Sequence, residues 1–343
     1  MTGCDRTSGS RPVTFRLGWD GQGSLAVVTS RGGLSRMSHP PYIAAPCSST
    51  GGTLRSRVWD FSNAETACEL LRDAAQLIRE DPNRRGSLLS FGLAGQLVMT
   101  GDLHGNQRNF EKLQRFCNLE ANPGRSVILH ELMHEEITAA DQVDRSIDLL
   151  LRAAAWKCEF PDNVFFLQSN HELAQLRGQE ITKAGRSVLY DFERGVALRF
   201  GAKTPEVLAA VNEYVAALPL AARTGNGLFL CHSLPDPLLL ENFDLSIFER
   251  EPRAVDLEPG GAAYSLVWGR FHAAEAVERF ARRLNVDAII VGHTPQDTGY
   301  AVIGPLIILA SDHNHGTFLP IDLSRRYTPQ TLEAAIRKFV SVP

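Results

Sequence analysis

The sequence predicts a layered α/β fold for one large domain, residues 58–343. From residue 96 onward, short apolar runs alternate with helical patterns, and this alternation is typical of sheets covered by helices. The 343 residues, of which 44% are hydrophobic, are enough to bury one full core. The sequence shows no internal repeat, so neither a solenoid nor a propeller is expected.

The first predicted helix starts at the spelling Ser62-Asn63-Ala64-Glu65, which has the form of a capping box. An apolar stripe at helical spacing follows it. The stripe consists of Ala67, Leu70, Leu71, Ala74, Leu77 and Ile78. We expect an amphipathic helix that ends near Asp81-Pro82.

Six apolar runs predict strands, at residues 97–99, 127–129, 164–167, 228–231, 288–291 and 306–310. Helical patterns lie at residues 147–156 and 273–284. A last helix is predicted to begin at Pro329, with Thr328 as its N-cap.

Residues 1–57 have a different composition. They are rich in Gly, Ser, Thr, Arg and Pro, a composition typical of chains that do not bury a core. We expect this N-terminal segment to be disordered.

The net charge argues against two classes of partner, nucleic acid and anionic membranes. The 35 Lys and Arg against 39 Asp and Glu give a net charge of -4, so no basic field predicts binding to nucleic acid or to an anionic membrane.

The six cysteines form no CxxC pair and are expected to be reduced thiols. No apolar run approaches the ~20 residues of a membrane span, and a secretory signal is not recognisable. The sequence therefore predicts a cytoplasmic protein without a membrane partner.

Polar side chains follow five of the predicted strands. They are Asp102 and His104, His130 and Glu131, Asn170 with His171 and Glu172, His232, and His293. Sites in open α/β sheets lie outside the carboxyl ends of the strands, so we expect these groups to converge. Imidazole and carboxylate ligands together suit Fe, Mn or Zn, and two such ions can share a carboxylate and a hydroxide. The sequence predicts a centre of two metal ions.

Several of these motifs resemble one family. GDLHGN at 101–106, SNHE at 169–172, the single His232 after a strand and VGHT at 291–294 together resemble the phosphoprotein phosphatase branch of the calcineurin-like metallophosphoesterases. LPLAAR at 218–223 and the segment 160–172 add to the resemblance, which covers about residues 96–322. It implies a four-layer α/β/β/α sandwich and metal-dependent hydrolysis of a phosphate ester.

The resemblance also implies roles for individual residues. Asp102 and His104 would bind the first metal ion, and Asn170, His232 and His293 the second. His171 would donate a proton to the leaving oxygen, a role that suits an imidazole with an ordinary pKa of about 6.5.

The second motif departs from the family. Where the family has GDxxDRG, residues 130–136 read HELMHEE. Glu131 thus replaces the bridging Asp, His134 replaces the carboxylate that orients the proton donor, and Glu135 replaces a phosphate-binding Arg. The family's HGG is altered as well, to His232-Ser233-Leu234.

A competing alignment places the family motif on DQVDR at 141–145. We favour Glu131 as the metal ligand because it directly follows an apolar run, whereas Asp141 lies in a polar loop. Arg145, at the start of the next helix, is retained as a candidate phosphate contact.

Arg270 is a second candidate phosphate contact. It follows an apolar run and Trp268, and resembles a substrate-facing Arg of related phosphatases. A guanidinium can hold a phosphate by two parallel hydrogen bonds. Residues 312–315, which follow the last predicted strand, are candidates for the rim of the site.

The predicted activity is hydrolysis of phosphate monoesters, with serine/threonine phosphoproteins as the leading substrate class. A small phosphoester such as a dinucleoside polyphosphate is the alternative substrate. The altered second motif leaves a further alternative, a catalytically degenerate protein that binds metal or a partner.

Overall fold

The computed structural model describes residues 15–19, 25–29, 59–139, 141–183 and 185–343. The chain divides into two compact units, Met1–Thr53 and Leu54–Pro343. In the first unit, β1 (Phe15–Trp19) pairs antiparallel with β2 (Leu25–Thr29). The remaining residues of the predicted disordered segment 1–57 lie outside the described ranges.

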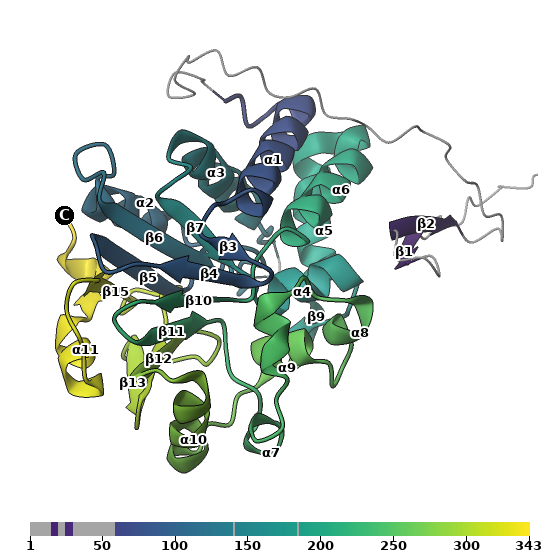
Figure 1. Cartoon of the computed structure of the whole chain (residues 1–343). Helices are drawn as coiled ribbons and strands as arrows, with labels where there is room; N and C mark the ends of the chain where they lie inside the picture. The colour runs from purple at the N-terminus through teal and green to yellow at the C-terminus, as the bar shows by residue number, and fades with distance from the viewer. Residues whose placement is uncertain (1–14, 20–24, 30–58, 140, 184) are drawn as a thin grey trace, which may run out of the picture. The chain divides into compact units, whose positions relative to one another are not determined.

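Two sheets form the centre of the second unit (Figure 1). The larger has the order β13 (Tyr300–Ile303), β14 (Leu306–Leu309), β12 (Ala288–Val291), β11 (Leu228–Cys231), β10 (Ala221–Thr224), β4 (Leu88–Phe91) and β3 (Arg84–Arg85). The smaller has the order β16 (Arg337–Lys338), β15 (Thr317–Asp322), β5 (Gln96–Asp102), β6 (Arg125–His130) and β7 (Val164–Leu167). The strands that precede site residues are parallel within each sheet, β5–β6–β7 in one and β11–β12 in the other.

Successive side chains along these strands point to opposite faces of a sheet. They therefore contribute to three separate hydrophobic cores. Ile128 of β6 and Ile290 of β12 belong to the core between the two sheets. Their neighbours Val127 and Leu129 belong to the core on the outer face of the smaller sheet, and Ile289 to the core on the outer face of the larger one. The strands are therefore apolar on both faces, which explains their uninterrupted apolar runs.

Helices cover both outer faces (Figure 1). Those contributing to the core of the smaller sheet are α1 (Ala64–Arg79), α2 (Gln107–Cys117), α3 (Ser146–Glu159), α5 (Val188–Phe200) and α6 (Thr204–Val215). Those on the larger sheet are α7 (Pro237–Leu240), η3 (Leu245–Glu249), α9 (Ala262–Trp268) and α10 (Ala274–Leu284). The predicted α/β/β/α layering is confirmed.

Seven further elements complete the described part of the second unit, and the first of them carries the site residues Asn170 and His171. They are α4 (Asn170–Arg177), β8 (Thr182–Lys183), β9 (Arg186–Ser187), η2 (Gly201–Lys203), α8 (Ala254–Leu257), α11 (Pro329–Ala335) and η4 (Phe339–Ser341). None of the helices in the described ranges combines the length and the apolar character that crossing a membrane requires.

The six predicted strands and the predicted helices are present, but the start of the first helix was assigned to the wrong cap. Asn63, not Ser62, is the N-cap of α1, and its side chain accepts the Thr66 N–H at 3.0 Å. Ser62 instead donates its hydroxyl to Asp60, at 2.6 Å. Thr328 caps α11 as predicted.

The two sheets meet at the end of β5. Asp102 forms a parallel bridge with Ala310, which directly follows β14 of the other sheet. A Cβ atom on Gly101 would lie 2.1 Å from the carbonyl oxygen of Leu309. Only glycine allows this approach, so Gly101 sets how closely the sheet edges converge.

We expect Gly101→Ala to destabilise the domain by about 1–3 kcal/mol, because the added methyl group overpacks the junction against backbone that cannot move aside. Gly92→Ala is the matched control, since a Cβ there meets nothing within 4 Å. Denaturant unfolding of both variants measures the difference. Equal stability of the two variants would contradict the role assigned to Gly101.

Candidate metal centre

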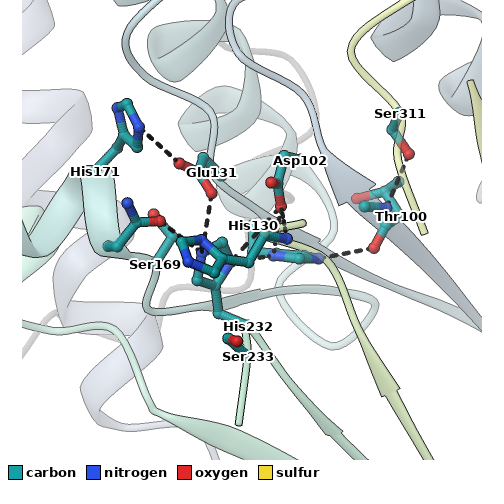
Figure 2. A network of polar contacts seen from close by, with 12 residues as sticks. Thr100, Asp102, His130, Glu131, Ser169, His171, His232, Ser233 and Ser311 are labelled. Carbon is teal, nitrogen blue, oxygen red and sulfur yellow. Dashed lines mark hydrogen bonds and ion pairs between the residues drawn. The ribbon is translucent and has the colours of Figure 1, made fainter. Parts of the chain in front are cut away.

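The predicted site residues come together where five strands end, and these strands belong to two sheets. The smaller sheet contributes the residues after β5, β6 and β7, and the larger sheet those after β11 and β12. Figure 2 shows Asp102, Glu131, His171 and His232 directed toward one another. The convergence expected at the strand ends of one open sheet is thus produced by the junction of two sheets.

Backbone hydrogen bonds join the altered second motif to the first. The N–H groups of Leu103 and His104 donate to the carbonyl of Glu131, at 3.0 and 2.9 Å. The Glu172 carboxylate accepts the Leu132 N–H at 2.8 Å. Since Ser169 caps the helix that carries Glu172, the SNHE motif fixes the turn in which Glu131 lies.

Several site residues, in this turn and outside it, have a strained, left-handed backbone conformation. Glu131 and His134 have φ values of 50° and 63°, and His104 and His293 have 42° and 64°. Four of the six non-glycine residues with positive φ in the described ranges are therefore site residues. Such conformations cost about 1–3 kcal/mol each and persist where surrounding structure enforces them.

One group of donor atoms surrounds Nε2 of His232. Asn170 Oδ1 lies 2.7 Å from it, and His293 Nδ1 lies 3.0 Å from it. Glu131 Oε2 is the third neighbour, also at 3.0 Å. All four residues are buried.

A second group surrounds the other oxygen of Glu131. His171 Nε2 and His104 Nε2 lie 3.4 and 3.6 Å from Glu131 Oε1. Glu131 is thus the residue common to these two groups, and a third group of donor atoms, from Asp102, His130 and His232, does not include it. Asp102 is placed differently, since its Oδ1 accepts the His293 N–H at 2.9 Å and lies 3.5 Å from His130 Nδ1.

The first group holds more lone pairs than protons. Nε2 of His232 carries at most one proton, whereas two oxygen acceptors, Asn170 Oδ1 and Glu131 Oε2, face it. Glu131 Oε2 is buried and accepts no hydrogen bond despite its 3.0 Å distance from His232. Unsatisfied buried acceptors are costly, and a cation at their centre removes the cost.

Burial favours the neutral form of every ionisable group here, which leaves the imidazoles able to bind metal and the carboxylates in need of compensating positive charge. Desolvation lowers the pKa of His104 to about 3 and that of His232 to about 4, so both imidazoles are neutral ligands. Desolvation, and after it the neighbouring carboxylates, raises the pKa values of Asp102 and Glu131 well above normal. The residues present fit divalent metal ions by donor type and by charge.

Outer partners fix which ring nitrogen of each imidazole faces the site. His104 Nδ1 lies 3.2 Å from the Met133 carbonyl, which only accepts, so Nε2 is the free ligand atom. His171 Nδ1 lies 2.9 Å from Nδ1 of His134. Nε2 of His134 lies 3.2 Å from Gln175 Oε1 and donates to it. His134 Nδ1 is therefore an acceptor, and His171 directs Nε2 toward Glu131.

The two candidate phosphate contacts are placed differently. The Arg270 guanidinium donates to the His293 carbonyl at 2.9 Å, which fixes it at the edge of the donor groups. Arg145 is exposed and precedes α3, and its N–H donates to Glu135 Oε2 at 2.9 Å. The Glu135 carboxylate thus braces the loop, and the contact found for Arg145 is made by its backbone.

The competing motif at 141–145 does not enter the donor groups. Asp141 is exposed, and the Asp144 carboxylate accepts the Ser146 N–H at 2.7 Å. The loop at 312–315 does approach the site, because the charge of Asp312 contributes to the raised pKa of Asp102. The backbone carbonyl of Asp312 also accepts from Asn106, at 2.8 Å.

Lys183 is a residue that sequence reasoning missed. It lies on the hairpin of β8 and β9, with an exposed side chain. Its positive charge contributes to lowering the pKa values of His104, Glu131, His134, His171 and Asp312. Its place eleven residues after the SNHE motif was the only signal, and that signal is weak.

Comparisons with known proteins agree with this geometry. The family model for calcineurin-like phosphoesterases matches residues 96–297, more than half of the chain. Serine/threonine-protein phosphatase 5 of Arabidopsis thaliana is 23% identical over 313 residues, covering 83% of this chain and 53% of the plant protein. The chain thus spans about half the length of that relative.

Two solved structures are similar in fold. A protein serine/threonine phosphatase from Saccharomyces cerevisiae, similar to human phosphatase PP5, has a TM-score of 0.55 at 17% identity and covers 76% of this chain and 82% of its own. A cold-active protein-tyrosine phosphatase from a Shewanella species has a TM-score of 0.52 at 12% identity, covering 73% and 80%. Together with the match to the family model, the donor groups show that the chain belongs to the calcineurin-like phosphoesterases, a family of metal-dependent phosphoric ester hydrolases.

Proposed function

We propose that this chain hydrolyses phosphate monoesters with two bound metal ions, Mn, Fe or Zn, and that serine/threonine phosphoproteins are its leading substrates. The observation that carries the proposal is the position of Glu131, whose two carboxylate oxygens face separate groups of donor atoms. A carboxylate shared in this way is the feature that a two-metal centre requires.

The donor set divides between two ions. Asp102, His104 and Glu131 would hold the first, and Glu131, Asn170, His232 and His293 the second. When bound, the ions would supply an activated water as nucleophile and positive charge for the phosphoryl oxygens. Glu131 is one methylene longer than the family's Asp and has a left-handed backbone conformation, with φ at 50°.

His171 is the proposed proton donor to the leaving oxygen. Its Nε2 faces the site at 3.4 Å from Glu131, and its Nδ1 is held by His134. Burial, and after it the neighbouring imidazoles, lowers the pKa of His171 well below normal. A carboxylate at position 134 would stabilise the imidazolium form, whereas the neutral His134 ring only orients it.

Arg270 and Lys183 are the proposed phosphate contacts. Both charges contribute to lowering the pKa of the same carboxyl group, that of Glu131, which supports positive charge near the donor groups. Arg145 remains a proposal with less support, because its described contact is through its backbone. Two cations beside the metal ligands favour an anionic ester as substrate.

The substrate class rests on similarity. The Arabidopsis relative is named as a serine/threonine phosphatase, and the match covers about half of that protein. Dinucleoside polyphosphates are the alternative substrate, and turnover on a phosphopeptide compared with diadenosine tetraphosphate separates the two. A degenerate, non-catalytic protein would bind metal and hydrolyse neither.

Cytoplasmic location is part of the same proposal. In the part of the chain that the structure describes, Cys68, Cys117, Cys158 and Cys231 are buried free thiols, which is consistent with a reducing compartment.

We expect Glu131→Gln to lower hydrolysis of p-nitrophenyl phosphate by about 100-fold or more and to reduce bound metal, because loss of even an outer partner costs about 10–100-fold. Glu136→Gln is the matched control, since Glu136 is exposed on the same segment. Metal analysis and steady-state kinetics measure both effects. Full activity of Glu131→Gln would reject Glu131 as the shared ligand.

We expect His134→Asp to raise kcat for a phosphoserine peptide, whose alkoxide leaving group needs a proton, by roughly 3- to 10-fold, since one pKa unit on His171 corresponds to about 1.4 kcal/mol. His134→Asn, which introduces no charge, is the control and should not show the gain. If kcat falls equally in the two variants, the assignment of His171 as the proton donor oriented by residue 134 is wrong.

We expect Lys183→Met to raise KM for a phosphopeptide by roughly 5- to 20-fold with kcat little changed, because an exposed cation that contacts the ester contributes about 1–2 kcal/mol. Lys338→Met removes an exposed lysine from β16 and serves as the control. An unchanged KM for Lys183→Met would remove Lys183 from the substrate site.

A further inference from the structure

We propose that His130 is a positioning residue for the second metal ion, because its ring accepts the Nδ1–H of His232 and so fixes His232 with Nε2 as the ligand atom. The inference rests on the two-metal centre proposed above. His130 stands where the family motif GDxxDRG has glycine, so its side chain is an addition made by this chain.

The direction of the hydrogen bonds follows from one fixed acceptor. His130 Nε2 lies 2.8 Å from the backbone carbonyl of Thr100 (Figure 2). A carbonyl oxygen only accepts, so Nε2 of His130 carries the proton. In the neutral ring, Nδ1 is then a lone-pair acceptor. The proton between the two rings must come from His232.

The contact between the rings is short. Nδ1 of His130 and Nδ1 of His232 are 2.9 Å apart, which is the length of a good N–H···N hydrogen bond. The alternative acceptor for the His232 proton is Asp102 Oδ1, but it lies 3.6 Å away. His130 is therefore the acceptor, and its ring and that of His232 are both buried, with 1% and 0% exposed.

The proton on Nδ1 of His232 determines the state of the other ring nitrogen, Nε2. With its proton on Nδ1, His232 presents an unprotonated Nε2 to the three donors Asn170, Glu131 and His293. Without His130, the proton could move to Nε2 and bond to Asn170 Oδ1 at 2.7 Å. That tautomer would block the ligand atom.

The surrounding backbone leaves room for the His130 ring. A Cβ atom on Gly292 would lie 2.5 Å from Cε1 of His130 and 2.3 Å from Asp102 Oδ1. Gly292 of the VGHT motif thus leaves space for the His130 ring and for the Asp102 carboxylate. The ring is anchored at both nitrogens, by Thr100 and by His232.

The test compares Mn²⁺ binding to the full chain by EPR titration in the wild type and two variants. His130→Leu fills part of the volume but has no acceptor, and we expect it to weaken the second Mn²⁺ by about 10–100-fold, as loss of an outer partner does elsewhere. His130→Asn places an amide oxygen near the position of Nδ1, and we expect affinity within about 3-fold of the wild type.

Two results would overturn the proposal. One is wild-type Mn²⁺ affinity in His130→Leu. The other is equal weakening in His130→Leu and His130→Asn, which would show that the ring acts by its volume alone.

A second measurement does not depend on folding of the variants. Long-range ¹H–¹⁵N spectra of the histidine-labelled wild type, metal-free and Zn-loaded, report the tautomers directly. We expect His130 as the Nε2–H form and His232 as the Nδ1–H form in both samples. A His232 ring protonated at Nε2 would contradict the proposal whether or not the protein hydrolyses any phosphate ester. Absence of turnover with these tautomers present would reject the proposed function alone.

Discussion

The site depends on one electrostatic constraint, the burial of the Glu131 carboxylate among neutral imidazoles. Its two oxygens lie 3.0 to 3.6 Å from ring nitrogens of His232, His171 and His104. Burying a carboxylate with acceptors is unfavourable without compensating positive charge. The fold accepts this cost at the junction of its two sheets, and metal ions are the chemistry that would offset it.

Apart from Glu131 itself, the altered second motif contacts the site imidazoles on the sides that face away from Glu131. Residues 130–134 offer the Met133 carbonyl to His104, the His134 ring to His171 and the His130 ring to His232. Each contact directs Nε2 of a site imidazole toward Glu131 or the donors around it. The departure from the family sequence therefore supplies outer partners, and it gives no reason to infer that metal binding has been lost. What it removes is the negative charge beside His171, and this change bears on catalysis.

Sequence reasoning predicted the site better than its surroundings. Asp102, His104, Asn170, His232 and His293 follow continuous apolar runs, and such runs mark buried strands whose ends are easy to place. Strands β10 and β15 were missed because their apolar residues are interrupted by Arg223 and Pro320. The role proposed for Lys183 involves a hairpin outside the central sheets, and the role proposed for His130 acts through another side chain. Neither relation can be read from spacing along the chain.

The most direct test of the two-metal account is anomalous X-ray diffraction from crystals of the full chain grown with Mn²⁺. The account predicts two anomalous peaks with Glu131 between them, one beside His104 and the other beside Asn170, His232 and His293. No peak, or a single peak that Glu131 does not touch, would contradict it.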